Sequence, residues 1–394
     1  VLAVLWPALL LYHVVDQAGG VRAIANALQE MIPEPGWLLV VLAWMLSPLV
    51  ENLAGFGLPI AIVAPMLILL GVIPVRAVAA TAVGHSWAVS LGGMALAFRT
   101  MTDITGVNES EVFPYAAILL GVSVLLTGLA SAWLLKQLYY WKRILLLALI
   151  VALTQYLVGI TGTIALSSFT ASIVGVVGGL LMARRPPGEK VRANMTPQLK
   201  GGLVSYGILF ISIFVVSIIK PLNQWLASVR LISQFPEVIT GSGLVTAAGP
   251  GFIFKPFTHP GFWILVSTVL AILLLPRLTR SGRPSLRPAL AATGRSGLPA
   301  TLGTIFMIGL STLMEHTGMT MQIAQGLSLA FGSVYPLVAP LVGALGAFAT
   351  GSNTNSNILF GPMQKGVAIL LGISPVLLLA AQTTGGALGS MIAP

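Results

Sequence analysis

Two polar, glycine-rich stretches interrupt apolar sequence near the two ends of this chain: Glu51-Asn-Leu-Ala-Gly-Phe-Gly57 and Gly351-Ser-Asn-Thr-Asn-Ser-Asn357. Inside a bilayer, an unpaired backbone amide or carbonyl group costs several kcal/mol. A membrane helix therefore breaks only where protein or a water-filled cavity supplies the missing hydrogen bonds. Two breaks at corresponding places in the two halves of a chain are a sequence sign of a transporter binding site.

The composition around these breaks is that of a membrane protein. The chain has 394 residues, of which 56% are hydrophobic and only 8% are charged, whereas soluble proteins carry about 25% charged residues. Its Lys and Arg residues, which give a net charge of +10, cluster in short loops between apolar runs. That pattern is typical of the positive-inside rule and argues against nucleic-acid binding. Because Cys is absent, disulfides and thiolate metal sites are excluded.

Apolar runs separated by polar punctuation predict the membrane segments, and one segment, Val21–Met31, is amphipathic and expected at the interface. The other predicted segments are Val1–Val15, Trp37–Val50, Leu58–Ile73, Val75–Phe98, Val112–Leu135, Ile144–Ile160, Gly162–Met182, Gly202–Ile219, Gly261–Pro276, Leu298–Met314, Met319–Phe331, Val334–Thr350, Ile358–Gly372 and Pro375–Pro394. The chain begins and ends in apolar sequence and does not start with Met, so we expect that it is truncated at both ends.

Charge predicts the orientation of these segments. The basic loops 136–143, 184–192 and 277–295 are each separated from the next by two predicted spans, so all three can lie on the cytoplasmic side. The acidic loop 103–111 and the long segment 221–260 then fall on the opposite side.

An internal repeat relates the two ends of the chain. Without a gap, Asn52 aligns with Asn353, Leu69-Leu70-Gly71 with Leu370-Leu371-Gly372, Pro74-Val75 with Pro375-Val376, Ala79-Ala80 with Ala380-Ala381, and Gly84 with Gly385. We therefore divide the chain into an N-terminal repeat (1–182, broken-helix motif 51–59), connecting spans and basic loops (183–298), and a C-terminal repeat (299–394, motif 351–357). Inverted repeats are a frequent plan of transporters.

Titratable groups in apolar sequence are the candidates for proton coupling. A carboxylate at membrane depth is a functional-site hypothesis by default, and this applies to Glu51. His85 lies mid-segment and can carry a proton near neutral pH. Glu315 and His316 form a further candidate pair. The alternatives are a helix-end position for Glu51, a hydrogen-bonded core histidine, and an interfacial turn at the last pair.

The substrate is expected to bind at the backbone and polar side chains of the two breaks. Glycine allows close approach of a ligand, and free amides at a helix N-terminus suit a carboxylate. The predicted binding residues are Asn52, Gly55, Gly57, Ser86, Ser352, Asn353, Thr354, Asn355, Ser356, Asn357, Thr383 and Thr384. The alternatives are tight helix packing through small residues at the first break and an aqueous loop at the second.

At these motifs the chain resembles the L-lactate permease family. The family pattern Glu-Gly-Ala-Ala-Gly-Phe-Gly-x-Pro is similar to the stretch 51–59, and Gly-Ser-Asp-Thr-x-Ser-Asn is similar to 351–357. Two later family runs resemble Leu371-Gly-Ile-Ser-Pro-Val-Leu-Leu-Leu-Ala-Ala-Gln-Thr383 and Gly385-Gly-Ala-Leu-Gly-Ser-Met-Ile-Ala-Pro394. The chain departs from the family at Asn52, at Asn353, which replaces an acid, and at His85-Ser-Trp-Ala88.

The resemblance implies proton-coupled uptake of lactate or a related 2-hydroxy acid such as glycolate. It also implies two inverted repeats with broken helices and re-entrant hairpins, in which the site moves past a scaffold as an elevator. The predicted fold is accordingly an all-α polytopic membrane protein of the bacterial inner membrane. The predicted partners are a small organic anion and the lipid bilayer, with a homodimer left open.

Other functions remain as alternatives. A different organic anion or coupling to Na⁺ instead of H⁺ is open, because Asn and Ser oxygens also bind hard cations. A passive channel would use the same broken helices. An enzyme is not expected, since the sequence has no phosphate loop, no zinc-ligand spacing and no nucleophile–base arrangement, and we predict no catalytic residue, metal or cofactor.

Overall fold

The computed structural model describes residues 2–54, 58–184, 194–239, 245–246, 249–279 and 285–393. Within these ranges, nine helices are long and apolar enough to cross a membrane, and a bent pair, Leu2–Gln17 with Gly20–Met31, meets the same test only when taken together. The predicted polytopic helical architecture is therefore confirmed.

The helices follow the predicted apolar runs closely. Their bounds are α1 Leu2–Gln17, α2 Gly20–Met31, α3 Pro35–Val41, a π-helical turn Leu42–Leu46, α4 Ser47–Ala54, α5 Leu58–Leu69, α6 Pro74–His85, α7 Gly92–Thr105, α8 Glu109–Leu134, α9 Trp141–Ile160, α10 Ile164–Met182, α11 Pro197–Ile218, α12 Lys220–Leu226, α13 Pro260–Thr279, α14 Leu286–His316, α15 Met319–Phe331, α16 Tyr335–Thr350, α17 Asn353–Leu371 and α18 Pro375–Gly389. Short 3₁₀ turns cover 86–88, 138–140, 256–258, 332–334 and 390–392.

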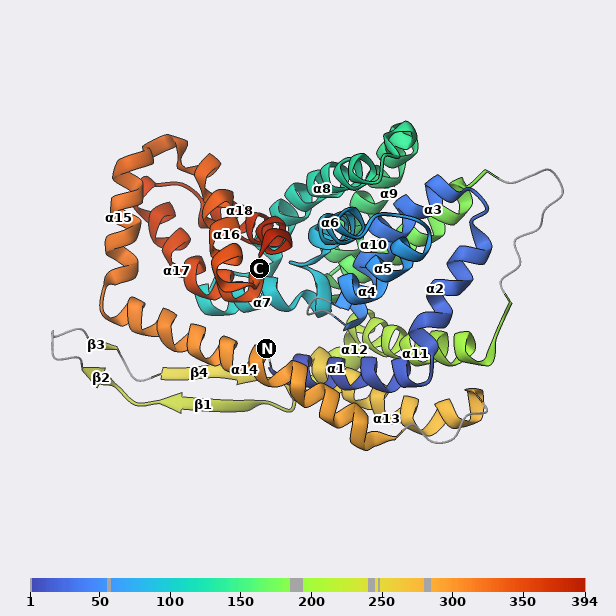
Figure 1. Cartoon of the computed structure of the whole chain (residues 1–394). Helices are drawn as coiled ribbons and strands as arrows, with labels where there is room; N and C mark the ends of the chain where they lie inside the picture. The colour runs from blue at the N-terminus through green and yellow to red at the C-terminus, as the bar shows by residue number, and fades with distance from the viewer. Residues whose placement is uncertain are drawn as a thin grey trace.

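The helices form two layers (Figure 1). The first, here called the frame layer, comprises α1, α2, α11, α13 and α14, and its helices contact one another extensively. The second, here called the broken-helix layer, comprises α3–α10 and α15–α18, and it contains both predicted breaks. In the view of Figure 1, α1, α11, α13 and α14 run along the bottom of the molecule, whereas α2 rises along its right side.

Two short sheets depart from the all-helical prediction. Strand β1 (Leu231–Phe235) pairs antiparallel with β4 (Gly249–Phe254), and β2 (Val238–Ile239) pairs with β3 (Val245–Thr246). These strands project from one side of the helices (Figure 1). They occur in the long segment 221–260, for which the charge pattern predicts a place outside the bilayer.

Two predicted segments are divided differently in the structure. The run Val75–Phe98 is not one helix, because it splits into α6, a 3₁₀ turn and α7. The second break is narrower than predicted: only Gly351 and Ser352 separate α16 from α17, and the polar run from Asn353 onward is helical. Helix α14 also crosses the predicted domain boundary at 298/299.

Helices α5 and α6 are short. Each has 12 residues, which at 1.5 Å per residue is about 18 Å. The hydrocarbon core of a bilayer is about 30 Å thick, so neither helix spans it alone. The turn between them contains Gly71, whose φ of 89° is readily adopted by glycine.

Two contacts bring the flanks of basic segments together. The Glu34 carboxylate accepts hydrogen bonds from Arg143 at 2.7 Å and from the backbone amide of Arg184 at 3.1 Å. Burial by itself would raise the pKa of the Glu34 carboxyl, but these hydrogen bonds outweigh it and hold that pKa below its usual range. A Cβ on Gly201 would lie 2.8 Å from the Thr279 side chain, which brings the start of α11 beside the end of α13.

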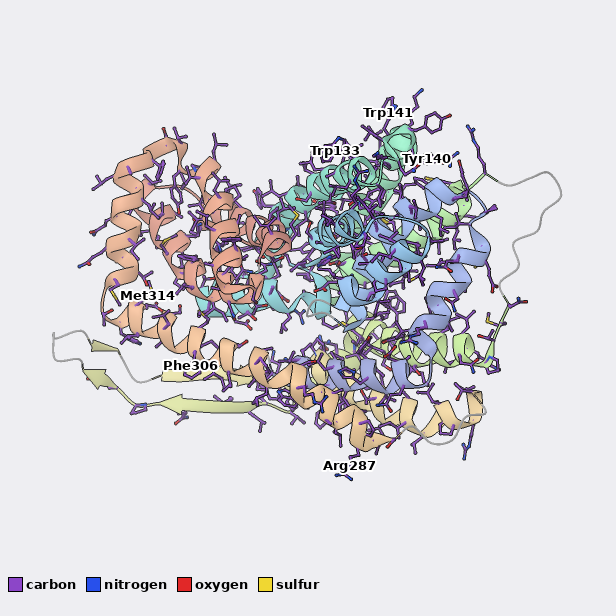
Figure 2. All side chains as sticks on the ribbon, viewed as in Figure 1. Trp133, Tyr140, Trp141, Arg287, Phe306 and Met314 are labelled. Atoms are coloured by element: carbon purple, nitrogen blue, oxygen red, sulfur yellow. The ribbon has the colours of Figure 1, made fainter. Side chains whose placement is uncertain are left out.

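The outer surface is strongly apolar. Trp133 is 68% exposed and Trp141 is 50% exposed, and Figure 2 shows both with Tyr140 at one corner of the molecule, around the α8–α9 turn. Tryptophan and tyrosine are enriched where a membrane meets water. Phe306 is exposed on α14, whose most apolar window is only 17% buried. Such faces are suited to contact with lipid.

Candidate functional site

The first break begins with a well-anchored amide. Asn52 lies in α4 and is only 4% exposed. Its Nδ2 is 2.7 Å from the Pro48 carbonyl, 3.1 Å from Ser168 Oγ and 3.0 Å from Ser172 Oγ, and it donates to these acceptors. The two serines are one turn apart on α10, so they present a polar edge to α4. This fixes the side chain of Asn52 against α10.

Glu51, which precedes it, is buried without a partner. The residue is 9% exposed, and no group in the described part of the chain donates a hydrogen bond to its Oε2. Gly92, at the start of α7, faces this pair: a Cβ there would lie 3.5 Å from Glu51 Cγ and 3.8 Å from Asn52 Oδ1. The predicted residues Gly55 and Gly57 lie outside the described residues.

The segment that approaches Glu51 is distorted. After Leu91 the backbone turns left-handed over three residues, with φ values of 53° at Gly93, 64° at Met94 and 59° at Ala95. A left-handed conformation of a non-glycine residue costs of order 1–3 kcal/mol, and such strain clusters at functional sites. A hydrogen bond of 3.2 Å from the amide of Phe98 to the carbonyl of Ser90 closes the turn.

The second break meets the same segment from the other side. Helix α17 begins with Ser352 as its cap, whose Oγ accepts from the amide of Asn355 at 3.3 Å. One residue further, Asn353 Nδ2 donates to Ser90 Oγ at 2.9 Å. Thr383 Oγ1, on α18, lies 3.0 Å from the same Ser90 oxygen. Ser90 and Gly92 are two residues apart, so both breaks converge on this short segment.

The hydrogen-bond directions in this cluster can be assigned. Ser90 Oγ donates its single proton to the carbonyl of Thr383 at 2.7 Å, so it accepts from Asn353. Asn357 Nδ2 donates to the carbonyl of Ala97 at 3.1 Å and to Thr383 Oγ1 at 2.9 Å. Asn357 therefore uses both of its amide protons, and Asn353 uses one.

Three side-chain acceptor oxygens at the start of α17 have no hydrogen-bond partner among the described residues. Asn353 Oδ1, Asn355 Oδ1 and Asn357 Oδ1 are buried, and no described group donates to them. Glu51 Oε2, on α4, is a further buried oxygen to which no described group donates. Each such group is costly unless a ligand, a proton or water satisfies it. The arrangement therefore fits a ligand that brings hydrogen-bond donors or positive charge.

A chain of hydrogen-bonded polar side chains connects this cluster to α16 and α18. Ser356 Oγ donates to the carbonyl of Gly343 at 2.9 Å, and Gln382 Nε2 donates to Ser356 Oγ at 3.1 Å. Gln364 Nε2 then donates to Gln382 Oε1 at 2.9 Å, and the hydroxyl of Tyr335 donates to Gln364 Oε1 at 2.9 Å. This chain links α16, α17 and α18 and orients the start of α17.

Other predicted site residues are not drawn into the cluster by hydrogen bonds. Ser86 donates to the carbonyl of Val83, and Thr384 donates to that of Ala380, each within its own helix region. His85 is 7% exposed and bonds through Nδ1 to the Thr81 carbonyl at 2.8 Å. Thr354 is half-buried in the first turn of α17, and Glu315 and His316 are exposed at the end of α14.

Sequence reasoning missed the residues that join the two breaks. Ser90 and Gly92 lie inside the single predicted segment Val75–Phe98, and Ser168 and Ser172 inside the predicted span Gly162–Met182. The pair Gly92-Gly93 directly after Ser90 was the available signal, because adjacent glycines inside a helical run often mark a turn or a close approach.

Comparison with known proteins identifies the family. The sequence profile described as L-lactate permease matches residues 1–394. The chain belongs to the L-lactate permease family. An L-lactate permease of Streptococcus iniae is 27% identical over 387 residues, covering 93% of this chain and 77% of that protein. An L-lactate permease of Escherichia coli K12 is 25% identical, covering 99% and 77%.

The family also contains a relative with a different printed substrate. A glycolate permease of Escherichia coli K12 is 24% identical over 442 residues, covering 99% of this chain and 77% of that protein. No solved structure matches the chain significantly. Members of the L-lactate permease family are permeases, so this chain is a multi-pass membrane transport protein and not an enzyme.

Proposed function

We propose that this chain is a secondary active transporter that takes up lactate, or a related small 2-hydroxy monocarboxylate such as glycolate, by proton symport. The observation that carries the proposal is the convergence of both breaks on Ser90–Gly92. Substrate sites of many transporters lie where discontinuous helices of two repeats meet. The printed names of the relatives, lactate and glycolate permeases, supply the substrate class.

The unsatisfied oxygens suit the hydroxyl group of such a substrate. A 2-hydroxy acid brings one hydroxyl donor, and Asn353 Oδ1 and Asn357 Oδ1 are free to accept it. The carboxylate needs donors instead. The start of α17 supplies backbone amides and the positive end of a 19-residue helix, which favours an anion. Hydroxyl and carboxylate would thus bind to different groups of the same helix terminus.

Glu51 is the proposed carrier of the coupled proton. Its carboxyl group is buried and unpartnered beside Gly92, close to where the substrate would bind. When Glu51 is protonated it no longer repels the substrate carboxylate, so proton and anion binding favour each other. His85 stays a second candidate, since it is buried on α6. Glu315 and His316 are less suited, because they are exposed at a helix end.

The matching geometry of the two ends supports an inverted-repeat plan. The turns after α5 and α17 carry Gly71 and Gly372, with φ values of 89° and 66°. A Cβ on Gly84 would clash with the carbonyl oxygen of Ala43, and one on Gly385 with that of Pro340. We call α3–α6 the N-terminal unit and α16–α18 the C-terminal unit. In the first, α6 packs directly on the backbone of the π-helical turn that follows α3, and in the second, α18 packs directly on the backbone of α16. Movement of the broken-helix layer against the frame layer is the proposed elevator step.

The proposed orientation places the basic loops 136–143, 184–192 and 277–295 in the cytoplasm of a bacterial cell, with the chain in the inner membrane. The contacts of Glu34 with Arg143 and Arg184 support a common side for the first two loops. The packing of Gly201 beside Thr279 supports the same side for the third. A homodimer stays an open proposal.

Uptake by reconstituted protein tests this function. Labelled L-lactate is offered to proteoliposomes with an inward proton gradient, with and without a protonophore, and glycolate is tested in parallel. We expect accumulation that the protonophore abolishes. Glu51→Gln should lose gradient-driven accumulation, whereas the control Glu111→Gln, which changes an exposed carboxylate at the start of α8, should keep it. Full accumulation by Glu51→Gln would refute its role.

A sodium-coupled symporter is the second candidate, and the excess of acceptors favours it. Amide and carboxylate oxygens are ligands for hard cations, and four such oxygens are left unsatisfied near the two breaks. The same vesicles, loaded with a sodium gradient at equal pH on both sides, separate the two candidates. Accumulation under the sodium gradient alone would replace the proton by Na⁺ in the proposal.

A further inference from the structure

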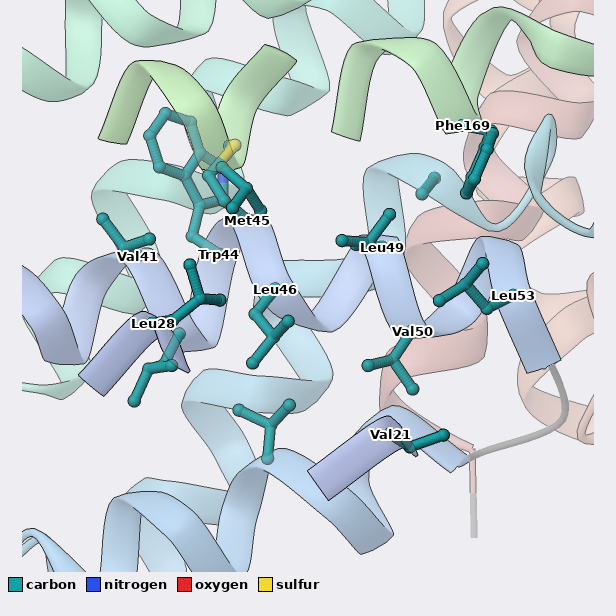
Figure 3. Packing of buried hydrophobic residues seen from close by; sticks show 14 of the residues in the cluster. Val21, Leu28, Val41, Trp44, Met45, Leu46, Leu49, Val50, Leu53 and Phe169 are labelled. Atoms are coloured by element: carbon teal, nitrogen blue, oxygen red, sulfur yellow. The ribbon is translucent and has the colours of Figure 1, made fainter. Parts of the chain in front are cut away.

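An apolar cavity lies between the frame layer and the broken-helix layer. It has a volume of about 410 Å³ and is lined by residues of α2, α4, α10 and α11. The lining side chains recur at helical spacing, for example Ile24 and Leu28 on α2, and Leu49 and Leu53 on α4. Figure 3 shows Leu28, Leu49 and Leu53 in this region, together with Phe169 of α10. Each of the four helices therefore turns an apolar face towards the same space.

The chemistry of this cavity excludes water as a stable occupant. A water molecule needs two to four polar partners, and cavities lined by aliphatic and aromatic side chains stay dry or take apolar ligands. The lining side chains here are aliphatic, aromatic or thioether groups. Tyr206 also lines the space, but its hydroxyl oxygen is buried and offers no surface to it. The cavity is thus an apolar volume.

The surroundings decide which apolar molecule is available. Helices α4, α10 and α11 belong to candidate membrane spans, and α2 is strongly amphipathic, as a helix at the membrane interface should be. Met195, which lines the cavity, is 67% exposed, so the space reaches the surface of the molecule beside the start of α11. A membrane lipid is the apolar molecule always present there.

We propose that one acyl chain of a membrane phospholipid occupies this cavity. The bound chain fills the gap between the two layers directly behind the helix face that carries Leu49 and Leu53. The proposal rests on the membrane location of the chain and not on the transported substrate or the coupling ion.

Gly207 provides a way to close the cavity. It lines the space, and a Cβ added to it meets no atom within 4 Å. Leucine at this position would project into the cavity without a clash and would replace glycine by a better helix former. Gly326 on α15 is the matched control, because it is also a helical glycine with open space and does not line the cavity.

Photolabelling tests the proposal. The protein is reconstituted with a phosphatidylglycerol that carries a diazirine in its acyl chain, and the labelled peptides are mapped by mass spectrometry. For the unaltered protein we expect saturable labelling of the cavity faces of α10 and α11. Gly207→Leu displaces about two methylene groups, which corresponds to about tenfold weaker labelling of these faces. Gly326→Leu should label as the unaltered protein does.

Two results of the photolabelling would contradict the proposal. Labelling of the cavity faces that rises linearly with probe, as for any lipid-exposed surface, would overturn the proposal. So would undiminished labelling in Gly207→Leu. If Gly207→Leu does not fold, as judged by size-exclusion chromatography, Ala27→Leu fills the same cavity from α2 and is measured in its place. Lactate uptake is not a readout here, so failure of this proposal and failure of the transport proposal are distinguishable.

Discussion

The two breaks use the same residue type in different ways. At the first, Asn52 bonds to Ser168 and Ser172, so its contacts stay within the N-terminal half of the chain. At the second, Asn353 bonds to Ser90 and therefore reaches across to the other half. The first break alone carries an acid, Glu51. The two breaks therefore contribute differently: the first supplies the titratable carboxyl group of Glu51, and the second supplies the hydrogen bond that joins the two halves of the chain at Ser90.

Adding a side chain at the close helix contact of either unit should destabilise the protein to a similar extent. This loss of stability is the largest effect that we expect. Gly84→Ala and Gly385→Ala each add a Cβ that clashes with a backbone carbonyl. Because backbone cannot rotate away as a side chain can, each variant should lose about 3 kcal/mol of stability. Thermal unfolding in detergent measures this, with Gly326→Ala as the control that has open space. A large loss at only one of the two glycines would break the equivalence of the units.

The cross-half contact should appear as an energetic coupling. In a double-mutant cycle, Asn353→Ala and Ser90→Ala remove the two ends of one hydrogen bond, so their stability effects should deviate from additivity by about 1 kcal/mol. Asn52→Ala and Ser90→Ala share no hydrogen bond and should add within about 0.5 kcal/mol. Chemical denaturation of the unaltered protein, the three single variants and the two double variants provides the numbers. Equal coupling in both cycles would remove the distinction between the breaks.

The smallest predicted effect is a pH dependence of stability that comes from Glu34, next to the start of α3. The folded-state pKa of Glu34 lies below its ordinary value of 4.5, so the carboxylate stabilises the fold above that pH. This contribution, about 1 kcal/mol or less for an ion pair near the surface, is lost as the pH falls below 4.5 through the folded-state pKa. Glu34→Gln should flatten the acid limb of a stability–pH curve. An unchanged acid limb would show that the pair with Arg143 is not stabilising.

Much of the fold was predictable from the sequence. Long apolar runs with basic loops predict membrane helices directly, and the described helices follow the predicted segments within a few residues in most cases. The extent of the second break was not predictable, because a run of Ser, Asn and Thr fits a loop as well as the capped first turns of a helix. The structure shows the helix, with Ser352 as its cap.

The candidate site was predictable only in part. Glu51, Asn52 and the run 352–357 stand out because polar residues are rare in apolar sequence. Ser90 and Gly92 do not stand out, since a lone serine and a glycine pair are common in membrane helices. Their importance comes from a left-handed turn at Gly93–Ala95 that only the three-dimensional packing reveals. The strands in 231–254 were likewise hidden by the absence of regular alternation.

The central claim is that the two halves meet at Ser90, and cross-linking tests it most directly. The chain has no Cys, so Ser90→Cys with Thr383→Cys introduces the only two thiols, at side chains whose oxygens are 3.0 Å apart. The account predicts that mild oxidation forms a disulfide, blocks uptake, and is reversed by reductant, whereas either single variant is unaffected. Two thiols that both stay free after oxidation would contradict it.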